Sequence, residues 1–223
     1  MLKQNGFVSI DSVAKALDVS RSTIRRDFWE LEQEGTLNCV HGGAMKALNK
    51  TSYEPPFKVR HDLFLEEKQR IARAAATLVK ENETLLLDSG TTIGQLANVL
   101  DRDMNLYVAT NDIMIAMTLA ENANINLTVL GGSIRRQHFS LYGYFTENML
   151  KQIHADKAFL GVDAIDFQIG FMNFSVDDVQ AKKLMIETSS ETIVLCDHSK
   201  FESIAFVKIC SFDQVDLVIT GKE

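Results

Sequence analysis

The chain has 223 residues, of which 46% are hydrophobic, and a formal net charge of −7. This composition is typical of a globular protein with a substantial core, and no apolar run reaches the roughly 18 residues of a membrane-spanning helix. The amino-terminal residues also lack the apolar core of a signal peptide. The three cysteines are widely separated and show no metal-ligand spacing. We therefore expect reduced thiols in a cytoplasmic protein, with no metal, no cofactor and no membrane partner.

Residues 9–17 and 20–32 are predicted to form two helices joined by a tight turn. Ser20 is placed to cap the amino end of the second helix. The apolar residues of that helix fall on one stripe that we expect to be buried: Ile24, Phe28 and Leu31. Two helices with so short a connection are typical of a helix-turn-helix, whose second helix reads DNA. An ordinary helical hairpin with a solvated basic end stays open as the alternative.

Basic and hydroxyl side chains crowd the first turns of the second helix, mostly off the apolar stripe: Arg21, Ser22, Thr23, Arg25 and Arg26. The amino end of a helix is the positive end of its dipole, so three arginines there are locally unfavourable. An external anion such as DNA phosphate would explain them. Residues 1–50 carry a net charge of +1 and residues 51–223 a net charge of −8. Because residues 51–223 are acidic and repel DNA phosphate, we expect the DNA contact to be confined to the basic face of this helix.

The residues after this helix predict a wing. Gly35 is placed to end the helix, residues 36–40 resemble a short strand, and His41-Gly42-Gly43 resembles a tight turn. A strand and turn in this position can lie on the DNA backbone or in the minor groove. The predicted DNA-contacting residues are Ser20, Arg21, Ser22, Thr23, Arg25, Arg26 and His41.

Here the sequence resembles the DeoR family of bacterial regulators of sugar metabolism. The residues that carry the resemblance are Val19-Ser20, Thr23-Ile24-Arg25-Arg26-Asp27, Leu31-Glu32, Gly35 and His41-Gly42-Gly43-Ala44. The resemblance implies binding to operator DNA. Family members begin with a full helix, whereas five residues precede Gly6 here, so we expect a truncated first helix. They also usually carry a basic residue in the wing, where this chain has Cys39 or its neighbour.

Pro55 and Pro56, the only prolines, indicate a linker, because a proline pair favours extended chain and bars a helix from running through it. We predict a winged helix-turn-helix domain over residues 1–50, a linker over residues 51–65 and an effector-binding domain over residues 66–223. In the last domain, apolar runs alternate with helical patterns, which predicts an α/β fold: a parallel sheet covered on both faces. The expected strands are residues 84–87, 106–109, 127–130, 158–162, 193–196 and 217–220, and the expected helices are residues 66–80, 93–100, 113–122, 145–153 and 176–189.

Polar residues follow five of these strands, and in such sheets ligands bind outside the carboxyl ends of the strands. The first strand ends in Asp88-Ser89-Gly90-Thr91-Thr92, a turn whose N–H groups and glycine suit an anion. The plainer alternative is that Thr91 or Thr92 caps the next helix. The other strand ends carry Thr110-Asn111, Gly131-Gly132-Ser133 with Arg135 and Arg136, Gly161-Val162-Asp163 and Asp197-His198-Ser199-Lys200. This mixture of N–H groups, cations, carboxylates and amides suits a phosphorylated sugar.

These strand ends are also similar to the effector domain of DeoR-type regulators. The resemblance implies a Rossmann-like fold related to ribose-5-phosphate isomerase, in which residues 89–92 hold the phosphate of a sugar phosphate and the other polar residues face the sugar. The predicted effector-contacting residues are Asp88, Ser89, Gly90, Thr91, Thr92, Asn111, Gly132, Arg135, Asp163, Lys182 and Lys200.

Two functions from different classes follow from these patterns. The first is a transcriptional regulator, expected to repress a carbohydrate-utilisation operon and to respond to a phosphorylated sugar. It would act as a homo-oligomer, a dimer or a tetramer, because one reading helix contacts too few base pairs to recognise a specific DNA sequence. The alternative is a sugar-phosphate isomerase-like enzyme with an accessory helical domain. No single catalytic base is marked out by the sequence, and we therefore favour the regulator.

Overall fold

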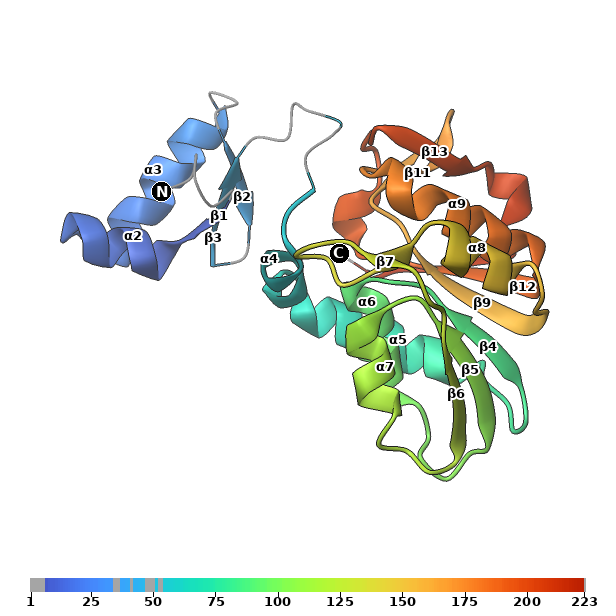
Figure 1. Ribbon diagram of the computed structural model, residues 1–223. Coiled ribbons are helices and arrows are strands. Elements are labelled where there is room, and N and C mark those ends of the chain that lie inside the picture. Colours follow the sequence, from blue (N-terminus) through green and yellow to red (C-terminus); the bar gives the residue numbers. More distant parts are fainter. Residues whose placement is uncertain (1–6, 34–36, 41, 47–50, 52–53, 223) are drawn as a thin grey trace. The chain divides into compact units, whose positions relative to one another are not determined.

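The computed structural model describes residues 7–33, 37–40, 42–46, 51 and 54–222 (Figure 1). The chain divides into two compact units, Met1–Phe64 and Leu65–Glu223. Within the described residues, no helix is both long enough and apolar enough to cross a membrane.

The first unit combines two helices with a small antiparallel sheet. Its elements are β1 (Phe7–Ser9), α2 (Ile10–Leu17), α3 (Arg21–Gln33), β2 (Leu37–Val40) and β3 (Gly43–Lys46). The strand order is β1-β3-β2, with β3 antiparallel to both neighbours. The β2–β3 hairpin is the wing that the sequence predicts after the second helix. Helix-turn-helix and wing are thus both present, as expected.

The apolar stripe of α3 is buried in the core of this unit. Ile24 is 2% exposed and Phe28 is 7% exposed, and they pack with residues of α2, β1, β2 and β3. Leu31 is partly buried against the same cluster. Both helices are capped by serine, because the Ser9 hydroxyl accepts from the Ser12 N–H at 3.0 Å and the Ser20 hydroxyl accepts from the Thr23 N–H at 3.1 Å. The cap that the sequence predicts at Ser20 is confirmed.

A short helix, α4 (Phe57–Asp62), lies inside the range predicted as a linker. It begins directly after Pro56, which is its N-cap residue. A proline pair bars a helix from running through it, but proline at a helix start lacks only an N–H that would have no intrahelical partner. The same two residues therefore separate α4 from the preceding chain and allow it to begin.

The second unit is built on a six-stranded parallel sheet with the order β14-β12-β9-β4-β5-β6. The strands are β4 (Thr84–Leu87), β5 (Leu106–Thr110), β6 (Ile125–Val129), β9 (Ala155–Gly161), β12 (Ser189–Leu195) and β14 (Leu217–Ile219). The helices are α5 (Leu65–Ala76), α6 (Thr91–Val99), α7 (Ile113–Leu119), α8 (Tyr144–Leu150) and α9 (Val176–Glu187). This confirms the predicted α/β fold with a parallel sheet.

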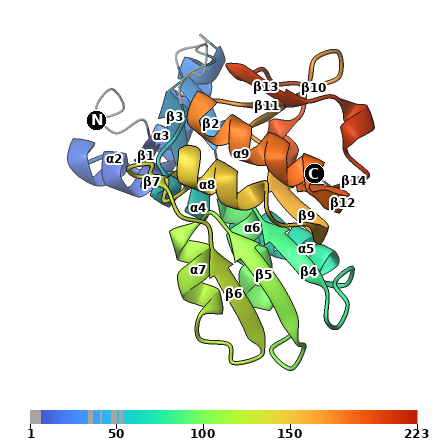
Figure 2. The ribbon, with the colours of Figure 1, turned by 45° about the vertical axis from the view of Figure 1, so that its right-hand side comes forward.

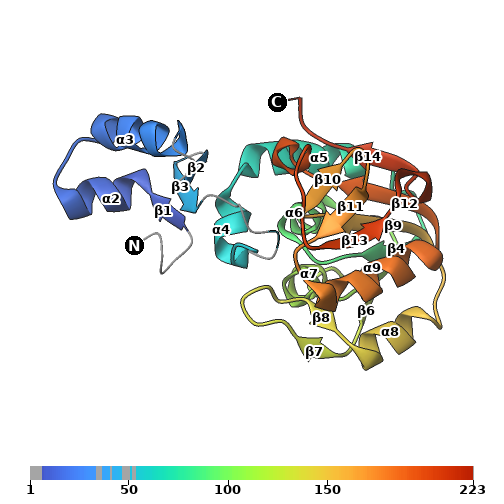
Figure 3. The ribbon, with the colours of Figure 1, turned by 90° about the horizontal axis from the view of Figure 1, so that it is seen from above.

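Helices cover both faces of this sheet. Leu85 and Leu87 of β4 point into one cluster with residues of α5, α6 and α7, whereas Leu86 points into a second cluster with residues of α8 and α9. In Figure 3, β4 and β9 lie between α5 and α9. Figure 2 shows α8 and α9 side by side. The alternation along β4 explains why the strand reads as a continuous apolar run.

Short antiparallel strands that the sequence does not predict complete the second unit. β10 (Ala164–Asp166), β11 (Gly170–Asn173) and β13 (Val207–Cys210) form a three-stranded sheet in the order β10-β11-β13. β7 (Ser133–Ile134) and β8 (Leu141–Tyr142) form a separate two-stranded ribbon. Two 3-10 turns, η1 (His198–Lys200) and η2 (Phe212–Gln214), follow strands β12 and β13.

Candidate functional site

Most of the predicted DNA-contacting residues lie in the amino-terminal half of α3, and Ser20 directly precedes this helix. Arg21, Arg25 and Arg26 are all exposed, whereas Ile24 and Phe28 are buried. Arg21 pairs with Asp11 at 2.6 Å, and the Arg26 side chain lies 4.0 Å from Asp27. Both pairs lie at the surface and contribute little to stability. The exposed basic end of α3 is therefore available to an external anion.

The end of α3 is tied to the wing by Glu32, whose Oε1 accepts from the backbone N–H of Cys39 at 2.5 Å. This bond joins the reading helix to β2, so the two candidate DNA-contacting elements are held together. Other predictions for this unit lie outside the described residues. They are the helix stop at Gly35, the wing residue His41 and the truncated first helix before Gly6.

The second candidate site lies at the carboxyl ends of the parallel strands. From β4 the chain proceeds outward to β5 and β6 and then returns to β9 on the other side of β4. The crevice between β4 and β9 is thus a topological switch point, where ligands bind in open α/β sheets. Gly161, at the end of β9, allows the two strand ends to approach closely: a Cβ there would lie 3.1 Å from the Ser89 carbonyl oxygen.

A buried ion pair occupies this switch point. Lys182 of α9 reaches the Oδ2 of Asp88 with its Nζ, and the same Nζ donates to the Gly161 carbonyl oxygen at 3.0 Å. Asp88 Oδ2 also accepts from the Gly161 N–H at 3.0 Å. The side chains of Asp88 and Lys182 are 0% and 4% exposed. Three predicted site residues are therefore brought together: Asp88, Lys182 and, at the end of β9, Asp163.

The charges around the pair oppose the cost of burial. Burial raises the pKa of Asp88, and Lys182 only partly offsets this. Burial alone would lower the pKa of Lys182, but the carboxylates of Asp88, Asp178 and Asp163 raise it above its usual value. Asp163 is itself held by the Phe174 N–H, which donates to its Oδ2 at 3.0 Å. Lys182 is consequently a fixed, charged group at the centre of the site.

Residues 89–92 form a turn into α6 that can accept an anion. Gly90, rather than Thr91 or Thr92, is the N-cap residue of α6, and within the described chain no side chain caps this helix. The first N–H groups of α6 are thus without the side-chain partner that a threonine cap would supply. Gly90 has a φ of +143°, which disfavours other residues, and a Cβ there would meet nothing within 4 Å.

The Asn111 side chain lies at the end of β5 and is 0% exposed. Its Nδ2 donates to the Leu141 carbonyl oxygen at 3.2 Å, while its Oδ1 has no hydrogen-bond partner among the described residues. Asp88 Oδ1 is also buried and has no hydrogen-bond partner among the described residues. Buried acceptors without donors are rare and costly in folded proteins. The two oxygens therefore mark positions where a bound molecule could supply donors.

Arg135 follows β7, and its guanidinium contacts Asp178 of α9. Asp178 also accepts from the Ser140 hydroxyl at 2.9 Å, and its side chain is 6% exposed. The positive charge of Arg135, one of the predicted effector-contacting residues, is thus largely neutralised by Asp178. Gly132 lies in the connection between β6 and β7, where a Cβ would lie 2.6 Å from the Tyr142 carbonyl oxygen.

Lys200 belongs to a different polar group, at the end of β12. Burial would raise the pKa of Asp197, but Lys200 and Lys68 hold it below its usual value. Nearby, Glu67 of α5 accepts from the His198 N–H at 2.8 Å and lies 2.8 Å from His198 Nδ1. The charge of Lys200 thus acts on Asp197, at the end of β12.

Two site residues are missing from the sequence prediction: Asp112 and Asp178. Asp112 is 1% exposed; its Oδ1 caps α7, and its Oδ2 accepts from the Gly90 N–H at 3.4 Å. Because a helix is predicted directly after Asp112, the sequence could have identified this residue as a helix cap. It could not have shown the contact with Gly90. Asp178 and Lys182 are four residues apart, a spacing that places both on one face of α9. That spacing could have identified Asp178.

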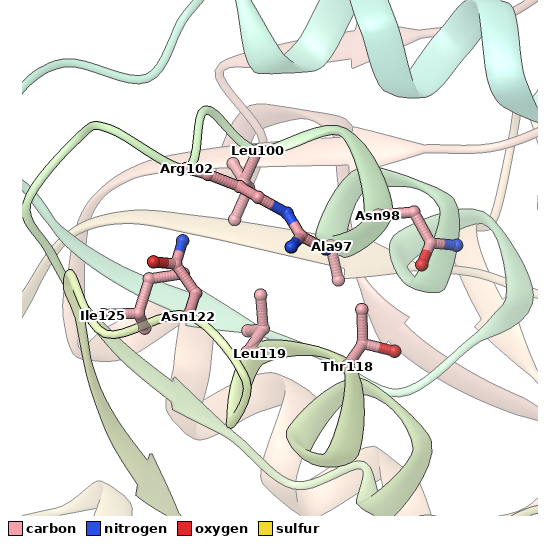
Figure 4. Close-up of a pocket in the computed structure, with 8 residues that line it drawn as sticks. All are labelled: Ala97, Asn98, Leu100, Arg102, Thr118, Leu119, Asn122 and Ile125. Carbon is pink, nitrogen blue, oxygen red and sulfur yellow. The ribbon is translucent and has the colours of Figure 1, made fainter.

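Two cavities lie away from this site. One, of about 30 Å³, lies between the carboxyl ends of α6 and α7, at the opposite edge of the sheet (Figure 4). The other, of about 370 Å³, lies between α9 and β13, with Lys183, Lys208 and Cys210 in its wall. Neither is lined by Asp88 or Lys182.

Both units match family models. The model of the DeoR-like helix-turn-helix domain matches residues 1–50, and the model of the DeoR C terminal sensor domain matches residues 64–222. The HTH-type transcriptional regulator GolR of Listeria innocua is 34% identical over 223 residues, which cover 100% of this chain and 87% of that protein. The Glycerol-3-phosphate regulon repressor of Escherichia coli is 34% identical over 220 residues, which cover 99% of this chain and 86% of that protein.

Solved structures show a likeness of fold. The eIF2B delta structure from Chaetomium thermophilum has a TM-score of 0.52 and 18% identity, covering 70% of this chain and 56% of that chain. Ribose 5-phosphate isomerase A from Methanocaldococcus jannaschii has a TM-score of 0.45 and 19% identity, covering 60% of this chain and 53% of that chain. The sequence matches over both units identify the protein: it belongs to the DeoR family and is a transcriptional regulator with a helix-turn-helix domain and a sensor domain.

Proposed function

We propose that this regulator binds operator DNA through α3 and represses a carbohydrate-utilisation operon until a phosphorylated sugar binds between the strand ends of the second unit. The exposed arginines of α3 supply the DNA contact. The turn before α6 supplies backbone N–H groups for a phosphate. The regulated class of genes is supported by the relatives, one of which is named for a glycerol-3-phosphate regulon.

One observation carries the assignment of the sugar. Asp88 Oδ1 and Asn111 Oδ1 are fully buried acceptors at neighbouring strand ends, and neither has a donor among the described residues. Sugar hydroxyl groups are donors, so a polyol chain laid across β4 and β5 would satisfy both oxygens. The amino end of α6 begins at the same edge of the sheet and would hold the phosphate. A ligand with a phosphate at one end and hydroxyls along its length fits this arrangement.

The regulator acts as a homo-oligomer in this proposal. A single α3 covers only a few base pairs, whereas two copies placed about 34–36 Å apart would read two half-sites on one face of the duplex. Because bacterial operator DNA lies in the cytoplasm, the regulator acts there in this proposal. The proposed activity is regulatory rather than enzymatic, because the buried Lys182 and Asp88 neutralise each other instead of presenting a free base.

The proposal is tested with the full chain and DNA fragments selected from a randomised pool. We expect a selected fragment to be released when one member of a panel of pentose, hexose and triol phosphates is added, glycerol 3-phosphate included. The same compounds should not be isomerised by the protein. Turnover of any of them, or a protein that selects no DNA sequence, would refute the regulator as described.

A separate variant tests the proposed contact with the sugar. Asn111→Ala removes one buried acceptor and should weaken binding of the releasing compound by about 1–3 kcal/mol. Asn126→Ala, at an exposed position of β6, is the matched control and should leave binding unchanged. Equal effects of the two substitutions in a calorimetric titration would remove Asn111 from the site.

A further inference from the structure

Asp112 holds the turn that the phosphate is proposed to enter. Its carboxylate has two functions in the structure. Oδ1 caps α7 by accepting from the N–H groups of Met114 at 2.8 Å and Ile115 at 3.1 Å. Oδ2 accepts from the N–H of Gly90 at 3.4 Å, at the first residue of the turn into α6. A carboxylate oxygen therefore already occupies part of the place where a phosphate oxygen would bind.

The surroundings of Asp112 hold an excess of negative charge. Among the described residues, the charge that acts on Asp112 is that of Asp88. Asp88 belongs to a connected group of charges whose other members are Lys182, Asp163, Asp178 and Arg135. With Asp112 there are four carboxylates for two cations. Both cations are already engaged, Lys182 with Asp88 and Arg135 with Asp178. A phosphate would add further negative charge without a free cation from this group to balance it.

We propose that an anionic group occupies the Gly90 turn only when Asp112 is neutral, so that effector binding takes up one proton from solvent. This inference rests on the proposed function and assigns to Asp112 the control of its pH dependence. The proton goes to Oδ2, the atom that faces Gly90. Once protonated, Oδ2 changes from an acceptor that repels the phosphate to an O–H donor that can bind it. Oδ1 keeps its cap of α7 in both states.

The protein reaches the neutral state of Asp112 easily. Burial raises the pKa of Asp112 to about 6, with a further contribution from the charge of Asp88, while the N–H groups of Ile115, Met114 and Gly90 act in the opposite direction. A bound anion would raise this pKa again, since a like charge disfavours the ionised form. Half of the free protein is therefore neutral at Asp112 near pH 6, and about one part in a hundred at pH 8.

The expected size of the effect follows from these populations. When only the neutral form binds, the apparent dissociation constant is the intrinsic one divided by the neutral fraction. The affinity should then fall by about 50-fold between pH 6 and pH 8. In Asp112→Asn, which keeps an oxygen for the α7 cap, the affinity for an anion that does not itself titrate should not change with pH. Asp112→Ser, which also caps helices without a charge, is the second variant should asparagine fold poorly.

The phosphate group itself titrates near pH 6, so the test uses two probes. Glycerol 3-phosphate and inorganic sulfate, which stays a dianion between pH 6 and pH 8, are titrated into the full chain and followed by thermal shift. Calorimetry in two buffers of different ionisation enthalpy then counts the protons taken up with glycerol 3-phosphate. Wild type should bind sulfate more weakly at pH 8, and both Asp112 variants should lose this dependence. Asp177→Asn, an exposed position on α9, is the control and should keep it.

The outcomes separate this inference from the proposed function. Binding of glycerol 3-phosphate or another panel sugar phosphate without proton uptake, or with the same pH dependence in Asp112→Asn as in wild type, overturns the role of Asp112 and leaves the effector site standing. Failure of every sugar phosphate and of sulfate to bind at both pH values overturns both. Proton uptake in wild type that is lost in the Asp112 variants alone supports the inference.

Discussion

Lys182→Met breaks the buried pair at the centre of the second unit and gives the sharpest test of the structure. The substitution keeps the aliphatic stem and removes the charge, so Asp88 remains fully buried without its cation. Removing one partner of a buried pair costs about 3–5 kcal/mol, because the remaining charge is left uncompensated. For a unit of this size 1 kcal/mol corresponds to about 2–4 °C. We therefore expect the melting temperature to fall by about 6–20 °C at pH 8.

The loss should depend on pH in a defined direction. Burial already raises the folded-state pKa of Asp88 above its ordinary value, and loss of Lys182 raises it further. Between the unfolded-state and folded-state pKa values the folded variant binds more protons than the unfolded chain, so its stability falls as pH rises. The deficit of Lys182→Met relative to wild type should thus be smaller at pH 5 than at pH 8.

Thermal unfolding of the full chain, followed by circular dichroism at both pH values, gives the melting temperatures, and urea unfolding gives the free energies of unfolding. Lys183→Met is the matched control, since Lys183 is the next residue of α9 and only half-buried; it should change stability by about 0.5 kcal/mol or less. The double variant Asp88→Asn with Lys182→Met should recover a large part of the loss, because no buried charge remains. A Lys182→Met protein as stable as Lys183→Met at pH 8 would show that the pair is not formed as described.

Four further results are expected. Arg25→Ala and Arg26→Ala should each weaken DNA binding, measured by fluorescence anisotropy. Loss of a base contact should cost about 1–3 kcal/mol at one operator position, whereas loss of a phosphate contact should weaken binding to all sequences evenly. Unchanged affinity would exclude these arginines from the interface. Gly90→Val should abolish effector release while DNA binding is kept, and a folded variant that still responds would refute the phosphate turn. In the free protein, Asp112→Asn should raise stability by up to about 3 kcal/mol at pH 8 and much less at pH 4, because the folded-state pKa of about 6 exceeds the ordinary value of 3.8; a urea series at the two pH values with no such difference would contradict the assigned titration. Sedimentation at micromolar concentration should show at least a dimer, and a monomer would contradict paired half-site reading.

The regular elements of the second unit follow from local patterns in the sequence. Leu85, Leu86 and Leu87 form an apolar run because the two faces of β4 are both buried, and this signal is strong enough to place the strand. β10, β11 and β13 span only three or four residues each, which is too short for a clear pattern. β10 and β11 pair as a local hairpin, but β13 joins β11 from a distant part of the chain, so the small sheet is absent from the prediction.

The site shows the same division between local and distant information. The strand-end polar residues could be predicted, because topology alone brings Asp88 and Asp163 to one edge of the sheet. The neutralisation of Arg135 by Asp178 could not, because the partner lies 43 residues away on α9. The role of Asp112 beside Gly90 depends in the same way on a contact across 22 residues. The assignment of the described residues to effector contacts remains a prediction.

Asp88 and Lys182 are 94 residues apart in the chain, so a nascent polypeptide cannot form the site until α9 has left the ribosome. Before that point Asp88 has no cation, and the crevice between β4 and β9 has no wall on the side of α9. A compound that binds in this crevice would bind the complete folded chain but not a shorter nascent chain. By mass action, it would stabilise the folded state. The effector would then also act as a folding ligand, and cells rich in it would accumulate more of the regulator from the same amount of message.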